Sequence, residues 1–390
     1  MKLVAGLGLL AVVAVGCRQQ HAEVVDLGGP GVPPLFDGGI PSRPSGPPPS
    51  FGPTVTASKP PAPLSGGTLR VLADGKTAVA ADPDRDQLSI VDLVGNTVKA
   101  TIALAAGDEP GRSVEDAAGR VHVVARGGGA LYTIDPALAA VTARRPVCAA
   151  PRGLAYEASG DRLHVACAGG ELVTLPAAGG AAVRTVQLER DLRDVVVVGG
   201  QLWVSTFRTA AIITVAADGS VAARQTLPMS HDFSGQSFAP SVAWRMMALP
   251  GGKVGVIHQR AVVGPVQVTP GGYGGDGTGG CGGIVQGAVT LLDGTQSPPG
   301  RGLAAVVLPA DFDYAPQSGQ LAVLSAGNGH TPMLGSVVVT PLAALGAGGA
   351  PDMGPVKDPG GCVNGVRPGV AGEAIALAFD GAGHLWMQTR

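Results

Sequence analysis

A short run of alternating apolar residues, preceded by a glycine, recurs seven times along this sequence. Alternation with a period of two indicates β-strands, and a glycine supplies the positive φ angle that a tight hairpin needs. We therefore expect a fold built from repeated strand hairpins. The copies read KTAVA, RVHVV, RLHVA, QLWVS, KVGVI, QLAVL and HLWMQ, and their glycines are Gly75, Gly119, Gly160, Gly200, Gly252, Gly319 and Gly383.

Further strands follow most of these copies. A third strand is visible in six units, as in QLSIVDL from Gln87, and a fourth in most, as in TVKATIAL from Thr97. Four antiparallel strands in about 40 residues are typical of a β-propeller blade. The sequence thus predicts an all-β, seven-bladed β-propeller over residues 67–390. The last blade is incomplete, since the seventh copy reaches Arg390 after its second strand. Either the N-terminal segment supplies the missing strands or the chain is a fragment, and we favour the fragment.

The blade sequences resemble a known family. PRGLAYEASGDRLHVACAGGELVTL, from Pro151, and DGKTAVAADPDRDQLSIVDL, from Asp74, are similar to YVTN-type or surface-layer bacterial β-propellers. The pattern also resembles the propeller portion of extracytoplasmic proteins in which a c-type cytochrome, di-haem-peroxidase-like domain follows the blades. No CxxCH motif is present, so no haem residue is carried over and no cofactor is expected in this chain. The resemblance implies a fold more than an activity, because propellers host many functions.

The N-terminus carries an export signal. Lys2 precedes an apolar run over residues 3–15 that is shorter than the roughly 20 residues needed to span a bilayer. The following Ala-Val-Gly-Cys resembles a bacterial lipobox, although its first residue is not Leu, and implies that residues 1–16 are cleaved and Cys17 is acylated. Arg18 replaces the Asp of inner-membrane retention, which favours the outer membrane. An ordinary signal peptide is the alternative, and both place the protein outside the cytoplasm.

Residues 17–66 are dominated by Pro, Gly and Ser, as in PSRPSGPPPSFGP from Pro41. Such a segment buries too little apolar surface to offset the entropy of ordering, so we expect a disordered tether. The formal net charge is -2, which gives no indication of a nucleic-acid partner. The expected partners are the membrane, through the lipid anchor, and a protein or haem domain.

Four cysteines remain besides Cys17, and an even number outside the cytoplasm favours disulfides. We predict the pairs Cys148–Cys167, on neighbouring strands of one repeat, and Cys281–Cys362, in long loops. Four cysteines allow three pairings, so the connectivity is a hypothesis. A zinc site is less favoured because there is no CxxC pair.

Long insertions are expected on one face of the ring, at residues 229–242, 259–286, 327–334 and 343–373. Loops on a rigid scaffold often carry function. His231, Asp232, His258 and His330 belong to or border these loops and form a candidate site. No metal is predicted, because sequence separation says nothing about distance and solvated or hydrogen-bonded histidines are the simpler interpretation.

Arginines recur seven or eight residues before the hairpin glycine in four successive units: Arg112, Arg152, Arg193 and Arg245. First strands line the channel of a propeller, so these side chains could gather at its mouth and bind an anion or an acidic partner. Neutralisation by neighbours such as Asp194 and Glu115 is the alternative.

No motif identifies an enzyme, since GxSxG and HExxH are both missing. The leading hypothesis is a non-enzymatic binding or scaffold propeller at the cell surface or in the periplasm, with its ligand or partner on the face of the long loops. The alternative is the propeller module of a c-type cytochrome or peroxidase-like redox protein whose haem domain would follow Arg390.

Overall fold

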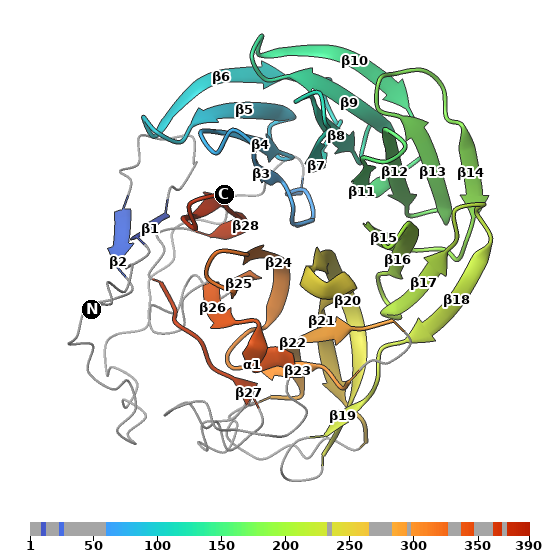
Figure 1. Ribbon diagram of the computed structural model, residues 1–390, viewed down its shortest axis with the longest axis vertical. Coiled ribbons are helices and arrows are strands. Elements are labelled where there is room, and N and C mark those ends of the chain that lie inside the picture. Colours follow the sequence, from blue (N-terminus) through green and yellow to red (C-terminus); the bar gives the residue numbers. More distant parts are fainter. Residues whose placement is uncertain are drawn as a thin grey trace, which may run out of the picture.

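The computed structural model describes residues 9–12, 23–26, 60–231, 236–264, 283–294, 298–326, 337–346, 362–368 and 373–390. Its sheets stand like blades around a central axis, with the first strand of each blade nearest the axis, as in a β-propeller (Figure 1). Two short helical turns, Pro250–Gly252 and α1 (Ala343–Gly346), interrupt the strands of this part of the chain. None of its helices is long and apolar enough to span a membrane.

Six sheets have three or more strands and form blades 1 to 6. Blades 1 to 4 are four-stranded meanders, blade 5 has six strands, and blade 6 has three. The bounds are β3 Leu69–Val71, β4 Thr77–Asp82, β5 Gln87–Asp92 and β6 Thr97–Ala103 in blade 1; β7 Pro110–Glu115, β8 Val121–Ala125, β9 Ala130–Asp135 and β10 Ala140–Pro146 in blade 2; β11 Pro151–Glu157, β12 Arg162–Cys167, β13 Glu171–Pro176 and β14 Arg184–Gln187 in blade 3; β15 Leu192–Val198, β16 Gln201–Thr206, β17 Ala211–Val215 and β18 Val221–Thr226 in blade 4; β19 Ser230–His231, β20 Ser237–Leu249, β21 Lys253–Val262, β22 Val285–Leu292, β23 Arg301–Leu303 and β27 Cys362–Val363 in blade 5; and β24 Leu308–Ala315, β25 Gln320–Ala326 and β26 Val337–Pro341 in blade 6. At the N-terminus, β1 (Leu9–Val12) pairs with β2 (Glu23–Asp26), and β1 contacts β29 (Leu385–Thr389).

The seventh repeat forms only a two-stranded sheet of β28 (Ala374–Phe379) and β29 (Leu385–Thr389). The predicted number of seven blades is therefore wrong: there are six, followed by this C-terminal pair. The pair still lies between blades 6 and 1, because Leu377 and Met387 pack against blade 6 while Ala378 and Trp386 pack against blade 1.

The hairpins follow the glycine pattern with one exception. The hairpin glycine has a positive φ in six of the seven copies, for example 65° at Gly75 and 77° at Gly119. In blade 3 the residue with positive φ is Asp161, at 48°. All seven predicted second strands lie in β4, β8, β12, β16, β21, β25 and β29.

The core consists of separate apolar layers between successive blades. Between blades 1 and 2, for example, Val79 and Leu88 pack against Val121 and Val123. Each layer is made mostly of Val, Leu, Ile and Ala, which fill the narrow space between twisted sheets. Each blade thus buries both faces only when its two neighbours are present.

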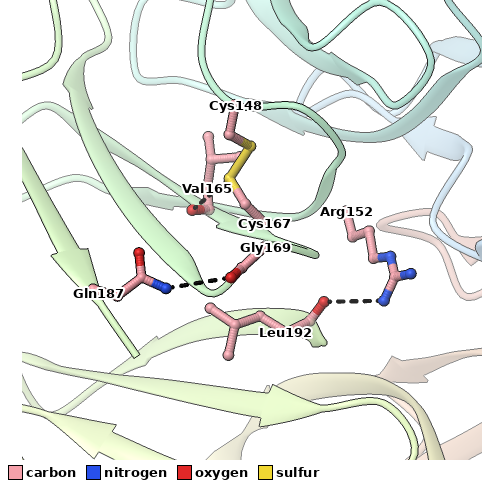
Figure 2. Close-up of a disulfide and its surroundings, with 7 residues drawn as sticks. All are labelled: Cys148, Arg152, Val165, Cys167, Gly169, Gln187 and Leu192. Atoms are coloured by element: carbon pink, nitrogen blue, oxygen red, sulfur yellow. Dashed lines mark hydrogen bonds between the residues drawn. A yellow bond between two sulfur atoms is a disulfide. The ribbon is translucent and has the colours of Figure 1, made fainter. Parts of the chain in front are cut away.

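A disulfide joins Cys148, in the connection from blade 2 to blade 3, to Cys167 at the end of β12 (Figure 2). This is one of the two predicted pairs, and its Cα atoms are 6.4 Å apart. Cys362 is also disulfide-bonded. Its predicted partner, Cys281, lies outside the described residues.

The end of the predicted tether, residues 60–66, belongs to the folded body. Ala62 is buried, its N–H donates to Asp84 Oδ1 at 3.0 Å, and its carbonyl accepts from Arg390 Nη2 at 2.7 Å. Leu64 packs against the layer between blade 6 and the C-terminal pair. The segment therefore reaches the channel mouth before β3 begins.

Candidate functional site

The first strands of several blades share a one-residue bulge close to one mouth of the channel. The register with the second strand shifts at this point in β11, β15, β20 and β24. A bulge re-aims the backbone and the following side chain. The bulged residues are Arg152, Arg193, Trp244 and Ala310, and the residues that follow them are Gly153, Asp194, Arg245 and Asp311.

Two buried ion pairs link different blades at this level. Arg112 of β7 pairs with Asp194 of β15, and Arg245 of β20 pairs with Asp311 of β24. Asp194 Oδ2 also accepts the Met246 N–H at 2.7 Å. Burial lowers the pKa of Arg112, although Asp194 opposes the shift, whereas the carboxylates of Asp311 and Asp194 outweigh burial and raise the pKa of Arg245. These contacts therefore join blade 2 to blade 4, blade 4 to blade 5 and blade 5 to blade 6.

Backbone carbonyls accept hydrogen bonds from the guanidinium groups of Arg112 and Arg193. Arg112 donates to Arg193 O at 3.1 Å, Trp244 O at 2.8 Å and Ser65 O at 3.2 Å. Arg193 donates to Trp244 O at 3.1 Å, Ser65 O at 3.1 Å and Leu64 O at 3.2 Å. The two arginines thus hold residues 64 and 65 over the mouth of the channel.

Arg193 is also held by aromatic rings. Its guanidinium carbon lies 4.7 Å from the centroid of Phe207 and 5.4 Å from that of Trp244. Burial lowers its pKa well below the ordinary value, and the charges of Arg112 and Arg152 add to that shift. Carbonyl and π-face contacts compensate for the loss of water around this cation.

Gly67 completes the closure at a place where a side chain has no room. Its φ is 66°, and a Cβ atom would lie 3.1 Å from Arg245 Cζ and 3.2 Å from Arg112 Cγ. The Gly67 N–H donates to Asp311 Oδ2 at 2.9 Å. We call residues 64–67 together with Arg112, Arg193, Arg245, Asp194 and Asp311 the channel clamp.

Three of the four predicted arginines therefore gather near the axis, and the fourth lies beside them. Arg152 is half-buried and donates to Asp191 Oδ1 at 2.7 Å and to Leu192 O at 3.5 Å (Figure 2). Arg112 and Arg193 are only 3% and 6% exposed, with donors directed at this chain's own oxygens. The geometry gives them a structural role, and anion binding by the four stays a prediction.

Aligning the repeats on the hairpin glycine did not reveal Asp194 and Asp311, the acidic residues of the channel clamp. The hairpins differ in length, so Arg152 and Arg193 are bulged residues whereas Arg245 follows the bulge. Alignment on the paired second strand instead places Asp194 and Asp311 at the position of Arg245. That alignment would have revealed opposite charges at equivalent places in different blades.

The predicted histidine site is described only in part. His231 Nδ1 lies 3.1 Å from Ser237 Oγ, while Asp232 and His330 are outside the described residues. His258 is buried, donates from Nδ1 to Gln259 O at 2.8 Å and accepts from Thr290 Oγ1 at 2.8 Å. Burial lowers its pKa to about 4. Within the described part of the chain, no group of three or more His, Cys, Asp or Glu could hold a metal ion.

A cavity of about 640 Å³ lies in the channel on the other side of the clamp. All of the first strands line it, from the level of Arg112, Asp194 and Arg245 to the hairpins, where Pro250 and Pro316 contribute. The cavity therefore lies toward the face of the short hairpins, opposite the long loops. The sequence analysis did not predict this cavity. The charged residues Arg70, Glu115 and Asp313, which lie on strands that line the axis, could have indicated it.

Comparison with known proteins identifies the fold. No protein family matches the sequence, and no curated protein does. Among solved structures, the chain is similar to Kuenenia stuttgartiensis hydrazine synthase, with 16% identity, a TM-score of 0.62, and coverage of 85% of this chain and 94% of that one. It is also similar to the Neurospora crassa Pan2 WD40 domain, with 10% identity, a TM-score of 0.53, and coverage of 82% and 84%. At these identities the similarity shows a β-propeller and no particular activity.

The clamp predicts a large stability effect at Arg112. Arg112→Gln leaves Asp194 buried without its cationic partner, so the free energy of unfolding should fall by about 3–5 kcal/mol in urea denaturation. Arg208→Gln removes an exposed guanidinium 3.8 Å from Asp191 and should change it by less than about 0.5 kcal/mol. Equal stabilities for the two variants would contradict the clamp.

The buried His258 predicts lower stability in mild acid. Its pKa is about 4 in the folded protein and about 6.5 when unfolded, so the unfolded state binds more protons between these values. This contribution is complete above pH 6.5 and is lost as the pH falls toward 4, which amounts to about 2 kcal/mol at pH 5. Urea unfolding at pH 7.5 and pH 5 should show a smaller pH effect in His258→Gln than in wild type. Identical pH effects would contradict this assignment.

Proposed function

We propose that this chain is an exported, lipid-anchored and non-enzymatic binding propeller, which holds a protein partner on the face of the long loops. The β-propeller fold is compatible with a binding or scaffold role, since a propeller offers a rigid ring from which loops can be presented. The observation that carries the proposal is the extension of blade 5 beyond the ring. Its strands β20 and β21 have 13 and 10 residues, whereas the strands of blades 1 to 4 have at most 7.

The extension exposes apolar side chains at its outer end. Val263 is 50% exposed and Ile284 is 44% exposed. The backbone joins this group, because Val262 N–H donates to Ile284 O at 2.9 Å and Val263 N–H donates to Ser237 O at 2.8 Å. Single exposed apolar residues are ordinary, so the support comes from the place of these side chains on a hairpin that projects from the ring.

A buried polar network makes the base of the extension rigid. Arg260 donates from Nε to Gln286 Oε1 at 2.8 Å and from Nη1 to Ser230 Oγ at 2.9 Å. Its guanidinium carbon lies 4.9 Å from the centroid of the Phe238 ring. Such a base positions the exposed tip with little loss of entropy when a partner binds.

The insertion after blade 6 is also tied to blade 5. Its strand β27 pairs in parallel with β23, with Gly302 opposite Cys362 and Leu303 opposite Val363. Ala304 N–H donates to Val363 O at 3.1 Å. The described residues 362 and 363 of this insertion are thus anchored on a neighbouring blade, which supports a binding role for this face.

Crosslinking from photoreactive residues on each face of the ring tests which face binds the partner. A photoreactive residue at Val263 or Ile284 should crosslink in living cells to one discrete protein, because these side chains face the proposed partner. Val94 and Leu138 are matched controls, since they are 73% and 72% exposed in the short turns of blades 1 and 2. A partner captured only from the control positions, or a lack of discrete products from all four, would contradict the proposal.

Anchoring is proposed to depend on Cys17. Cys17→Ser removes the thiol that would carry the lipid, so the variant should move from the membrane to the soluble fraction. Mass spectrometry should detect a lipid adduct on the N-terminal peptide of wild type alone. Membrane association of the variant equal to that of wild type, with no adduct on wild type, would contradict lipid anchoring.

The alternative role, as the propeller module of a haem-containing redox protein, has no specific observation in its favour. The similarity to hydrazine synthase extends to the fold, which the Pan2 WD40 domain shares. We therefore propose the binding role.

A further inference from the structure

The channel cavity contains one arginine that the clamp does not use. Arg70 of β3 lines the cavity and is exposed to it. Its guanidinium interacts electrostatically with Asp313 and Arg245 of blades 6 and 5 and also with Glu115 of blade 2. Charges from three other blades therefore act on the Arg70 guanidinium.

Arg70 has no direct polar partner within the described part of the chain. Among those residues, no carboxylate or carbonyl accepts a hydrogen bond from its guanidinium, whereas Arg112 and Arg245 each have a carboxylate. Enclosure by the strands lowers its pKa, with the charges of Asp313 and Glu115 opposing that shift. The guanidinium remains charged at neutral pH, so its donors face an open space with their hydrogen-bonding capacity unused.

The two nearby carboxylates are already held by backbone groups. Asp313 Oδ2 accepts the Phe379 N–H at 2.7 Å, and burial raises the pKa of Asp313. Glu115 Oε2 accepts the Ala73 N–H at 2.7 Å near the hairpin end. These contacts anchor both carboxylates at the wall while Arg70 keeps its donors for another acceptor.

We propose that the channel cavity binds a small organic monocarboxylate, with its carboxylate on Arg70 and its apolar body along the channel wall. The lining also includes partly buried apolar residues, among them Val71, Met247 and Phe379. A volume of about 640 Å³ lies within the usual range of small-molecule sites, roughly 300–1,000 Å³. A planar carboxylate matches the guanidinium fork, whereas a phosphate dianion would be repelled more strongly by Glu115 and Asp313.

The site opens away from the partner face. The clamp closes the channel toward the long loops, and the cavity extends to the hairpins at Pro250 and Pro316. The ligand therefore enters from the short-hairpin face. This proposal does not depend on the proposed protein partner, so either can fail alone.

Methyl NMR of the methionines reads the site directly. The full chain has seven methionines, and Met246 and Met247 line the cavity. In ¹³C-methyl-labelled protein, titration with hexanoate should shift these two signals, assigned through Met246→Leu and Met247→Leu. Hexanamide and hexylammonium, which have the same chain but no negative charge, should shift them at concentrations at least tenfold higher. Met229, on the opposite face, should stay unchanged.

Variants at position 70 test the anchor. Arg70→Gln should raise the Kd for hexanoate about tenfold or more, because it removes a charge-assisted hydrogen bond. Arg70→Lys should fall between that variant and wild type, and Arg208→Gln, which changes an exposed arginine outside the channel, should equal wild type. Arg70 has no partner to lose, so Arg70→Gln should keep the wild-type methyl spectrum.

Several outcomes would overturn the proposal. These are no shift of Met246 or Met247 with hexanoate up to its solubility limit, equal shifts with hexanamide, tighter binding of hexylammonium, or an unchanged Kd in Arg70→Gln. If Arg70→Gln failed to fold, a wild-type Kd in Arg70→Lys combined with equal hexanamide binding would likewise exclude recognition of the carboxylate.

Discussion

The pairing of buried arginines with aspartates across the axis holds the ring at one mouth. Apolar layers bind each blade to its two neighbours, but they do not reach across the channel. The Arg112–Asp194 pair does, because it joins blade 2 to blade 4 without a contact through blade 3. Gly153 of blade 3 allows this approach, since a Cβ there would lie 2.7 Å from Asp194 Cα. A buried pair often adds little net stability compared with apolar packing, so its main effect here is to define the relative positions of the blades.

The same clamp explains why the end of the N-terminal segment is ordered. Residues 64 and 65 lack a sheet partner, and their carbonyls are satisfied by Arg112 and Arg193. The junction between blade 1 and the C-terminal pair is closed by other polar contacts. Thr68 Oγ1 donates to Gln388 Oε1 at 2.7 Å, and Gln388 Nε2 donates to Ala81 O at 2.7 Å. These hydrogen bonds add to the apolar packing between the two-stranded sheet and blade 1.

The fold was largely predictable because its signals are local. Alternation in segments such as RLHVA and the glycines of the hairpins depend only on neighbouring residues, and every second strand was located correctly. The pair Cys148–Cys167 followed from strands adjacent in one repeat. The blade count of seven was wrong because it included the last repeat, whose two expected strands form a two-stranded sheet and not a blade.

The site was less predictable because it depends on register. A bulge changes which residue faces the axis, and no local signal distinguishes Arg193, at the bulge, from Arg245, after it. The four arginines therefore looked equivalent in sequence, while the structure assigns them to ion pairs, carbonyls and aromatic rings. Arg70, which the sequence did not single out, lines the cavity and has no hydrogen-bond partner among the described residues.

Because the clamp closes the channel toward the long loops, the two faces of the ring offer different chemical groups to a ligand. Every arginine of the clamp is occupied by oxygens of this chain, so the long-loop face offers a partner mainly the apolar tip of blade 5. The opposite face offers a cavity with a cation that is unpaired within the described part of the chain and a wall of mixed polar and apolar residues. Apolar surface on a projecting hairpin suits a macromolecule, whereas an enclosed cation suits a small ligand that leaves water completely. Because the clamp lies between them and is rigid, occupation of one face has no direct path to the other, and the two binding roles are expected to be independent unless residues 64–67 move.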